Sequence, residues 1–200
     1  MDEVVRPWRG VSAEERRSAR RARLLEACLD EVGEGGVESV TADTVVARAG
    51  LSKRYFYEAF ADREQILLAA LDGLLDVIRE RVAEALDAEE VAERVRRTVE
   101  TLARTLAEDP RQARLFEEAS RSAVLERRRH QEFRVFSELL ATGVYADRGA
   151  ETADVTAWFV VAGTVEVLAR WLAGAVALDE SRVVDVITDI GVRLSGGTAL

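Results

Sequence analysis

Residues 47–67 read ARAGLSKRYFYEAFADREQIL, and this stretch decides the fold. Thr41 and Ser52 are good helix N-caps, so they predict two short helices, the first of which ends at Gly50. Two helices joined by a tight glycine turn within about 20 residues are typical of a helix-turn-helix. The rest of the chain must show whether the charges and aromatics of this segment serve packing, binding or both.

In a helix-turn-helix, the N-terminal residues of the second helix face base edges in the major groove. Here those residues are Ser52, Lys53, Arg54 and Tyr55. Lysine and arginine donate to guanine O6 and N7, and the Tyr57 hydroxyl can reach a phosphate. The pattern therefore predicts a DNA-reading helix. The alternative is a helical hairpin inside a larger bundle, with its charges simply solvated.

The remaining aromatics of the segment are expected to pack rather than bind. Phe56 and Phe60 lie four residues apart, on the side of the helix opposite Tyr55 and Tyr57. Residues at this spacing share one face of a helix. With Leu51 in the turn, they are predicted to form a small core.

Composition points to an all-α protein of about nine helices. Hydrophobic residues make up 48% of the 200 residues, with only 13 Gly and 2 Pro, and strong helix formers dominate. Helical spacing and caps predict a first helix from Ser12 to the glycines at 33–36. Asp62 is predicted to cap a fourth helix that runs to about Leu86. Further helices are expected at 88–107, 110–121, 123–145, 151–177 and 180–194.

Charge is distributed unevenly along the chain, whose formal net charge is -9. Residues 1–63 carry 11 Arg and Lys against 12 Asp and Glu, whereas residues 64–200 carry 17 against 25. Nucleic-acid binding needs a local basic surface rather than a basic whole. The N-terminal third is therefore where such a surface can form.

Residues 45–71, VVARAGLSKRYFYEAFADREQILLAAL, resemble the TetR family of ligand-responsive transcriptional regulators. In that family an Ala-Gly-Val-Ser segment leads to a short recognition helix, followed by an aromatic, a Phe, a cap and a basic residue. The likeness is close over residues 12–70 and is limited to length and helical character beyond them. The matching residues are Ala47, Ala49, Gly50, Leu51, Ser52, Tyr57, Phe60, Asp62 and Arg63.

The resemblance implies a DNA-binding domain over residues 1–64 and a helical ligand-binding and dimerisation domain over 65–200. It places phosphate contacts at Thr41, Tyr57 and Arg63, and groove-facing side chains at Lys53, Arg54 and Tyr55. It further implies a repressor that a small molecule releases from a palindromic operator.

Two features depart from the family or stay open. Gly-Thr or Pro-Thr is common in the family where this chain has Arg54-Tyr55, so the operator sequence cannot be copied from relatives. The arginines of the first helix are either a solvated face or contacts to flanking phosphates. In the second case Arg6 and Arg9 would form an arm in the minor groove.

The C-terminal half is expected to dimerise and to hold the ligand. The helices predicted at 151–177 and 180–194 are too apolar to stay exposed, so they predict a two-fold symmetric homodimer interface. Glu166 and Arg170 are expected to pair there or to touch a ligand. Mostly apolar side chains favour a hydrophobic or aromatic effector. The candidate pocket residues, each of which could instead be plain core, are Leu102, Phe116, Phe133, Phe136, Leu140, Trp158 and Val161.

Other functional classes find little support in the sequence. There is no HExxH or GxSxG motif and no phosphate-binding glycine loop, so an enzyme is not expected. His130 is expected to be exposed and Cys28 buried, with no metal or cofactor site. Glu166 and Arg170 disfavour a membrane span, and a cytoplasmic protein is expected. The rivals are a sequence-tolerant architectural DNA-binding dimer without a ligand, and a helical interaction module.

Overall fold

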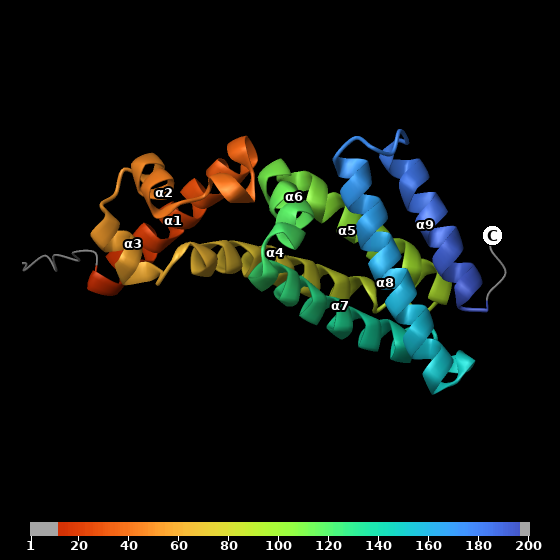
Figure 1. Cartoon of the computed structure of the whole chain (residues 1–200). Coiled ribbons are helices and arrows are strands. Elements are labelled where there is room, and N and C mark those ends of the chain that lie inside the picture. The colour runs from red at the N-terminus through yellow and green to blue at the C-terminus, as the bar shows by residue number, and fades with distance from the viewer. Residues whose placement is uncertain (1–11, 197–200) are drawn as a thin grey trace, which may run out of the picture.

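The computed structural model describes residues 12–196, which fold into helices and loops without a β-strand in that range (Figure 1). This architecture confirms the predicted all-α class. Three short 3-10 helices accompany the α-helices: η1 Val37–Ser39, η2 Glu118–Arg121 and η3 Ala146–Arg148. The α-helices are α1 Ala13–Gly35, α2 Ala42–Ala49, α3 Lys53–Ala59, α4 Arg63–Ala85, α5 Val91–Glu108, α6 Pro110–Glu117, α7 Ala123–Gly143, α8 Ala150–Leu172 and α9 Glu180–Leu194.

Helix α1 begins with a capping box. The Ser12 hydroxyl accepts a hydrogen bond from the Glu15 amide at 3.0 Å, and the Glu15 carboxylate accepts one from the Ser12 amide at 2.6 Å. These bonds satisfy amides that a helix leaves unpaired at its start. The helix ends at Gly36, whose φ of 80° lies in the region that favours glycine.

Helices α2 and α3 form the predicted helix-turn-helix. Gly50 ends α2 in the left-handed conformation, with φ 60° and ψ 39°. Phe56 and Phe60 are buried, with ring centroids 5.9 Å apart, which confirms that they form the core of this unit. Ser52 occupies the N-cap position of α3, but its side chain makes no capping hydrogen bond.

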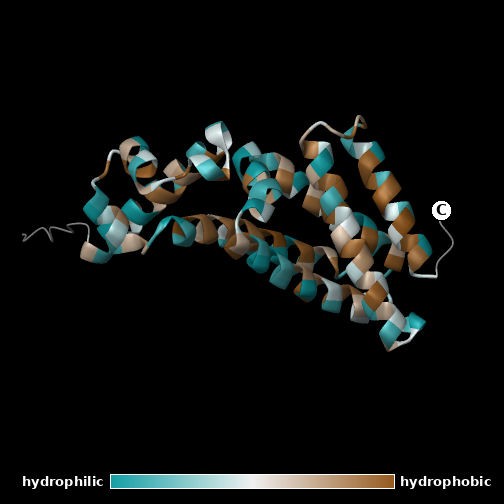
Figure 2. Ribbon diagram, viewed as in Figure 1, coloured by the Kyte–Doolittle hydropathy of each residue, from teal (hydrophilic) through white to brown (hydrophobic). Residues whose placement is uncertain are grey.

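Helix α4 connects the helix-turn-helix to the rest of the chain. It begins after Asp62, whose carboxylate accepts a hydrogen bond from the Gln65 amide at 2.8 Å. Its 23 residues span about 34 Å, and it contacts α1, α5, α6 and α7 in turn (Figure 1). Figure 2 shows apolar residues along its length. The division into two domains at residues 64/65, inferred from the sequence, stays a proposal.

The remaining helices form a bundle in which α7 packs on α8, α5 packs on α9, and α8 contacts α9 (Figure 1). Two predicted boundaries differ from the structure. The helix expected at 110–121 divides into α6 and η2. The helix expected at 151–177 ends at Leu172, because Gly174 takes a φ of 74° and the Trp171 indole donates to the Leu178 carbonyl at 2.9 Å.

Helix α8 is the one helix of the described range that is long and apolar enough to cross a membrane. Within the chain, 28% of its most apolar window is buried. The helix carries an ion pair between Glu166 and Arg170 at 2.7 Å, which is costly in lipid. Its packing against α7 and α9 indicates a bundle helix with one open apolar face, not a convincing membrane span.

Candidate functional site

The N-terminal end of α3 is open to solvent. The side chains of Lys53 and Arg54 are 56% and 84% exposed, and Tyr55 and Tyr57 lie on the surface as well. Lys53, Arg54 and Tyr57 are more than half exposed, whereas Tyr55 is 37% exposed because the Arg20 side chain packs on its ring. The exposed N-terminal end of α3 meets the requirement for a helix that enters the major groove.

Both cations of α3 already have acidic partners. The Lys53 ammonium lies 2.7 Å from the Asp43 carboxylate on α2, and the Arg54 guanidinium lies 2.8 Å from that of Glu58. The hydrogen bonds to these carboxylates raise the pKa of Lys53 and of Arg54. Exposed pairs of this kind contribute little to stability because solvent screens them, so a phosphate or base edge can replace the carboxylates. The pairs hold the cations in place without blocking them.

Three arginines of α1 pack onto the helix-turn-helix, which sequence reasoning missed. The Arg20 guanidinium lies 4.5 Å from the Tyr55 ring centroid, and that of Arg21 lies 5.0 Å from the Phe60 ring centroid. Arg23 donates to the Ala49 carbonyl at 2.5 Å, at the end of α2. These contacts fix α3 and orient Tyr55, so this part of the basic face is more than a solvated surface. Arg6 and Arg9 of the expected arm lie outside the described residues.

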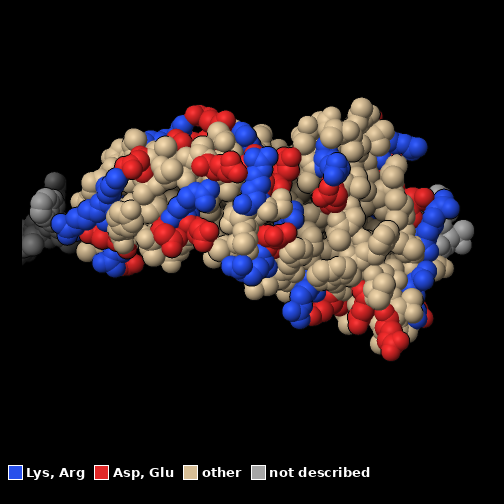
Figure 3. All heavy atoms as spheres, viewed as in Figure 1, with Lys and Arg blue, Asp and Glu red and all other residues tan. Residues whose placement is uncertain are grey.

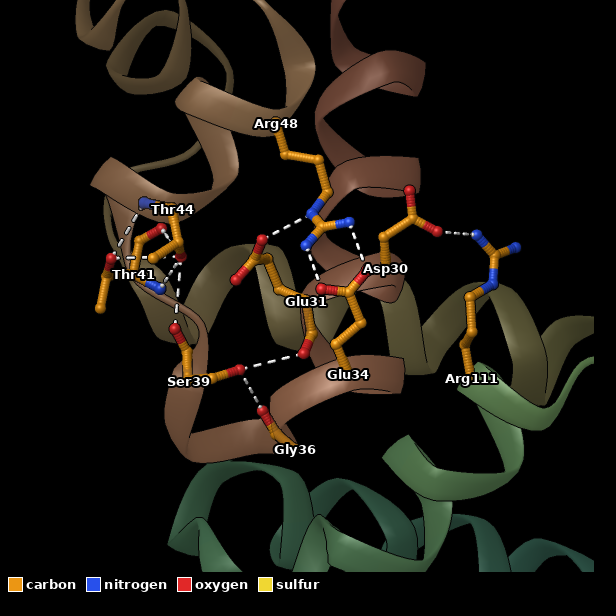
Figure 4. Close-up of polar contacts among 9 residues, drawn as sticks. All are labelled: Asp30, Glu31, Glu34, Gly36, Ser39, Thr41, Thr44, Arg48 and Arg111. Atoms are coloured by element: carbon orange, nitrogen blue, oxygen red, sulfur yellow. Dashed lines mark hydrogen bonds and ion pairs between the residues drawn. The ribbon is translucent and has the colours of Figure 1, made fainter.

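The predicted phosphate contacts start from ordered positions. Thr41 caps α2, because its hydroxyl accepts a hydrogen bond from the Thr44 amide at 3.1 Å (Figure 4). The Arg63 guanidinium donates to the carbonyls of Val37 and Val40, each at 2.6 Å. Arg63 therefore ties the start of α4 to the segment between α1 and α2. Its contact to phosphate stays a prediction, as does that of Thr41.

Two further arginines fix the flanks of α1 (Figure 4). Arg48 of α2 forms ion pairs at 2.5 Å with both Glu31 and Glu34. Hydrogen bonds from Arg48 lower the pKa of Glu34. Arg111 of α6 lies 2.5 Å from Asp30. The helix-turn-helix is thus attached through α1 to a helix of the C-terminal bundle.

A buried carboxylate completes this attachment. Glu118 in η2 accepts a hydrogen bond from the Val37 amide at 2.8 Å and another from Arg114 at 3.0 Å. Arg114 also donates to the Gly33 carbonyl at 3.0 Å. A Cβ at Gly36 would lie 2.5 Å from the Glu118 carboxylate, so only glycine leaves room for this contact. We call these contacts of Glu118 and Arg114 with α1 and η1 the junction clamp.

The junction clamp makes a pH-dependent contribution to stability. Burial alone would raise the pKa of Glu118, but the hydrogen bonds from Val37 and Arg114 outweigh it and hold the pKa below the ordinary 4.5. A depressed folded-state pKa gives stability that is present above the unfolded value and lost as pH falls through the folded value. The clamp is therefore complete at neutral pH and fails in acid.

Glu118→Gln is expected to lower the free energy of unfolding at pH 7 by about 1–3 kcal/mol, because a charged acceptor is lost. The deficit should shrink as pH falls from about 4.5 through the lower folded-state pKa, because the wild-type carboxylate then also becomes neutral. Urea denaturation at pH 7 and pH 3.5 measures both values. Glu117→Gln is the matched control, since Glu117 is the exposed neighbour. A deficit independent of pH would contradict the clamp.

An apolar cavity of about 70 Å³ lies within the bundle, between α4, α5, α7 and α8. Six of the seven predicted pocket residues line it: Leu102, Phe116, Phe133, Phe136, Leu140 and Val161. Sequence reasoning did not name Thr98 or Glu132, which also line the wall. Glu132 follows the charged run at 126–129, where nothing in the local pattern marks a buried position.

Trp158 was predicted to line the pocket, and the structure contradicts this. Its side chain is 41% exposed and lies outside the cavity lining. Helix α8 is apolar nearly all round, so its sequence does not show which face turns inward. Val161 faces the cavity, whereas Trp158, three residues earlier, belongs to the outer surface.

The outer face of α8 and α9 carries unpartnered apolar side chains. Figure 3 shows few charged residues over α8 on the side in view. Glu166 and Arg170, an exposed pair on α8, lie away from the cavity lining. The exposed apolar residues are Val155, Trp158, Phe159 and Val167 on α8, and Val186 and Ile190 on α9.

Reactive and metal-binding groups are scarce in residues 12–196. No group of three or more His, Cys, Asp or Glu side chains in this range is arranged to hold a metal ion. His130 is exposed beside Phe133, with ring centroids 6.0 Å apart. Cys28 is buried in the α1 core, and burial raises the pKa of its thiol to about 12, so it remains protonated.

Comparison with known proteins covers both halves of the chain. The family described as "Bacterial regulatory proteins, tetR family" matches residues 24–70. The HTH-type transcriptional regulator BetI of Rhizobium meliloti is 32% identical over 69 residues. This match spans 34% of this chain and 34% of BetI, about a third of that relative's length.

Solved structures share the whole fold at low identity. A transcriptional regulator from Rhodococcus sp. RHA1 superposes with a TM-score of 0.76 at 18% identity, covering 90% of this chain and 98% of that one. The multidrug binding protein EbrR, complexed with imidazole, gives 0.64 at 24% identity, over 88% and 92%. Residues 24–70 thus match the TetR family of bacterial regulatory proteins, and the chain as a whole shares the all-helical fold of these solved structures.

Proposed function

We propose that the chain is a cytoplasmic transcriptional repressor that leaves a palindromic operator when a small apolar ligand binds. The observation that supports this most is the uncovered N-terminal end of α3, with Lys53, Arg54 and Tyr55 on its surface. In this proposal Ser52, Lys53, Arg54 and Tyr55 face base edges. Thr41, Tyr57 and Arg63 position the helix on phosphates.

The proposed operator has two half-sites because the chain acts as a homodimer. Phe159, Gly163 and Val167 lie four residues apart on the outer face of α8, so they form one stripe. A Cβ at Gly163 would meet no atom within 4 Å, so a partner helix could approach closely there. Pairing of α8 and α9 with their copies would present two α3 helices to half-sites about 34–36 Å apart.

Helix α6 and its extension η2 offer a physical link between ligand and DNA. Phe116 lines the cavity, and Glu118, two residues later, holds the Val37 amide in the junction clamp. Arg63 of α4 holds the Val37 carbonyl. A ligand that displaces Phe116 or α4 would therefore move the segment that carries the helix-turn-helix. It can shift the equilibrium only by its differential affinity for the two arrangements.

Selection of bound duplexes from a random DNA pool tests the proposal. A regulator should enrich one palindrome and hold it against competitor DNA with a salt-dependent affinity. Enrichment without a consensus would favour the architectural alternative. Absence of binding would favour a helical interaction module, and either result would overturn the proposal.

Lys53→Ala and Arg54→Ala are expected to weaken binding to the selected duplex by about 10–100-fold each, because each removes a contact to a base edge. Discrimination against a scrambled duplex should fall with the affinity. Titration by fluorescence anisotropy measures both. Arg104→Ala on α5 is the matched control, since it removes an exposed positive charge far from α3. Equal losses for the control and the α3 variants would indicate a general charge effect.

A further inference from the structure

We propose that the cavity selects an uncharged, elongated apolar molecule with one hydrogen-bonding group, and that it rejects cations and anions of the same size. The inference deepens the proposed ligand response and rests on it for the link to DNA. Three features of the cavity wall support it: the shape of the wall, the pairing of the Glu132 carboxylate with two arginines, and an unpaired hydroxyl on Thr98.

The shape of the wall favours an elongated ligand. Lining residues run from Leu75 on α4 to Leu86, the residue directly after this helix, and from Val95 to Leu106 along α5. Eleven residues of helix rise about 16 Å, so the two helices line a long, narrow space. Its volume, about 70 Å³, is well below the ~300–1,000 Å³ of ordinary ligand sites. A slim molecule therefore needs the smallest displacement of the wall.

A buried carboxylate in an apolar wall would ordinarily attract a cation, but two arginines already compensate the negative charge of Glu132. Arg79 donates to both of its oxygens, at 3.0 and 2.8 Å, and Arg128 donates to one at 2.8 Å. Asp76 and Asp72 in turn hold these arginines, at 2.9 and 2.6 Å. Among the residues that line the cavity, neither a cationic nor an anionic ligand finds an unpaired opposite charge. The Arg129 guanidinium lies over the Phe116 and Phe133 rings, at 5.8 and 5.6 Å from their centroids, and is not part of the lining.

The pKa of Glu132 agrees with this geometry. Burial alone would raise it, but the hydrogen bonds from Arg79 and Arg128 outweigh the effect of burial and keep it below the ordinary value. The carboxylate is therefore ionised and engaged at neutral pH. A cation would have to displace an arginine from it, which would leave a buried charge without its partner.

Thr98 supplies the polar contact that the ligand is inferred to make. Its side chain is 8% exposed and lines the cavity, and its hydroxyl has no hydrogen-bond partner among the described residues. Buried polar groups are nearly always paired, so an unpaired hydroxyl in a binding wall marks a contact left for a ligand. A hydroxyl or carbonyl oxygen on the ligand would complete it.

Three probes with the same chain length separate the possibilities: 1-decanol below its solubility limit, and decanoate and decyltrimethylammonium below their critical micelle concentrations. They are added to the full chain, and Tm is followed by circular dichroism. Only 1-decanol is expected to give a saturable rise in Tm, since a ligand that binds the folded state stabilises it. A rise with the ammonium or decanoate equal to that with 1-decanol, or no rise with 1-decanol, would overturn the inference.

Two threonine variants test whether the ligand binds in this cavity and contacts the Thr98 hydroxyl. Thr98→Val keeps the shape of the side chain and should weaken 1-decanol binding by about 5-fold, because one hydrogen bond is lost. Thr188→Val is the matched control, since Thr188 is also buried with an unpaired hydroxyl but lies on α9, outside this cavity. Equal weakening by both variants would contradict the assigned contact.

Adding the selected duplex distinguishes the two proposals. If 1-decanol binds but no duplex does, the proposed regulator function fails while the ligand class stands. If the duplex binds and an ion rather than 1-decanol raises Tm, the ligand class fails while DNA binding stands.

Discussion

Phe56→Ala is expected to lower the free energy of unfolding by about 3–5 kcal/mol and to abolish specific DNA binding. The Phe56 ring is fully buried and contacts Tyr57 and Phe60, with centroids 5.4 and 5.9 Å apart. Its removal leaves a cavity at the centre of the helix-turn-helix. Helix α3 has only seven residues, too few to persist without tertiary packing.

Urea denaturation and anisotropy titration with the selected duplex measure the two effects of Phe56→Ala. Tyr57→Ala is the matched control, because Tyr57 is 58% exposed beside Phe56. It should cost less than about 1 kcal/mol in stability while weakening DNA binding through loss of a phosphate contact. If Phe56→Ala retained wild-type stability, α3 would not depend on this core.

Phe159→Asp is expected to convert the proposed dimer into a monomer, raising the dimer dissociation constant by at least about 100-fold. Phe159 is 67% exposed within the chain and lies at the centre of the outer face of α8. A two-fold interface contains the substituted side chain twice, so two charges would be buried without partners. Sedimentation velocity over a concentration series measures the change.

Val77→Asp is the control for the interface. Val77 is an exposed apolar residue on α4, away from α8 and α9, so the same charge there should leave the oligomeric state unchanged. Phe159→Asp should also weaken binding to the palindrome while leaving half-site binding detectable. A Phe159→Asp protein that stayed dimeric would place the interface elsewhere.

The sequence predicted the helix-turn-helix well because its signals are local. The Thr41 cap, the N-cap position of Ser52, the turn at Gly50 and the spacing of Phe56 and Phe60 all depend on residues close by in the sequence. Local rules of this kind hold when every level of the structure agrees. The confirmed part of the fold is therefore the part that short-range chemistry specifies.

The contacts that sequence reasoning missed join residues far apart in the chain. The Glu118 carboxylate meets the Val37 amide across 81 positions, and Arg79 meets Glu132 across 53. Nothing near Glu118 or Glu132 distinguishes them from the solvated acids around them. The prediction that Trp158 lines the pocket missed for a different reason. A helix that is apolar on all sides carries no signal for which face is buried.

The Lys53 ammonium, which pairs with Asp43, also offers a chemical probe of α3. Lys53 is the single lysine among 28 basic residues, and its side chain is more than half exposed. Its amine is consequently the only side-chain amine that an acylating reagent can modify. A mass-spectrometric footprint of that one position, taken with and without a duplex, would follow the occupancy of α3 directly, because arginine guanidinium groups stay protonated and do not compete.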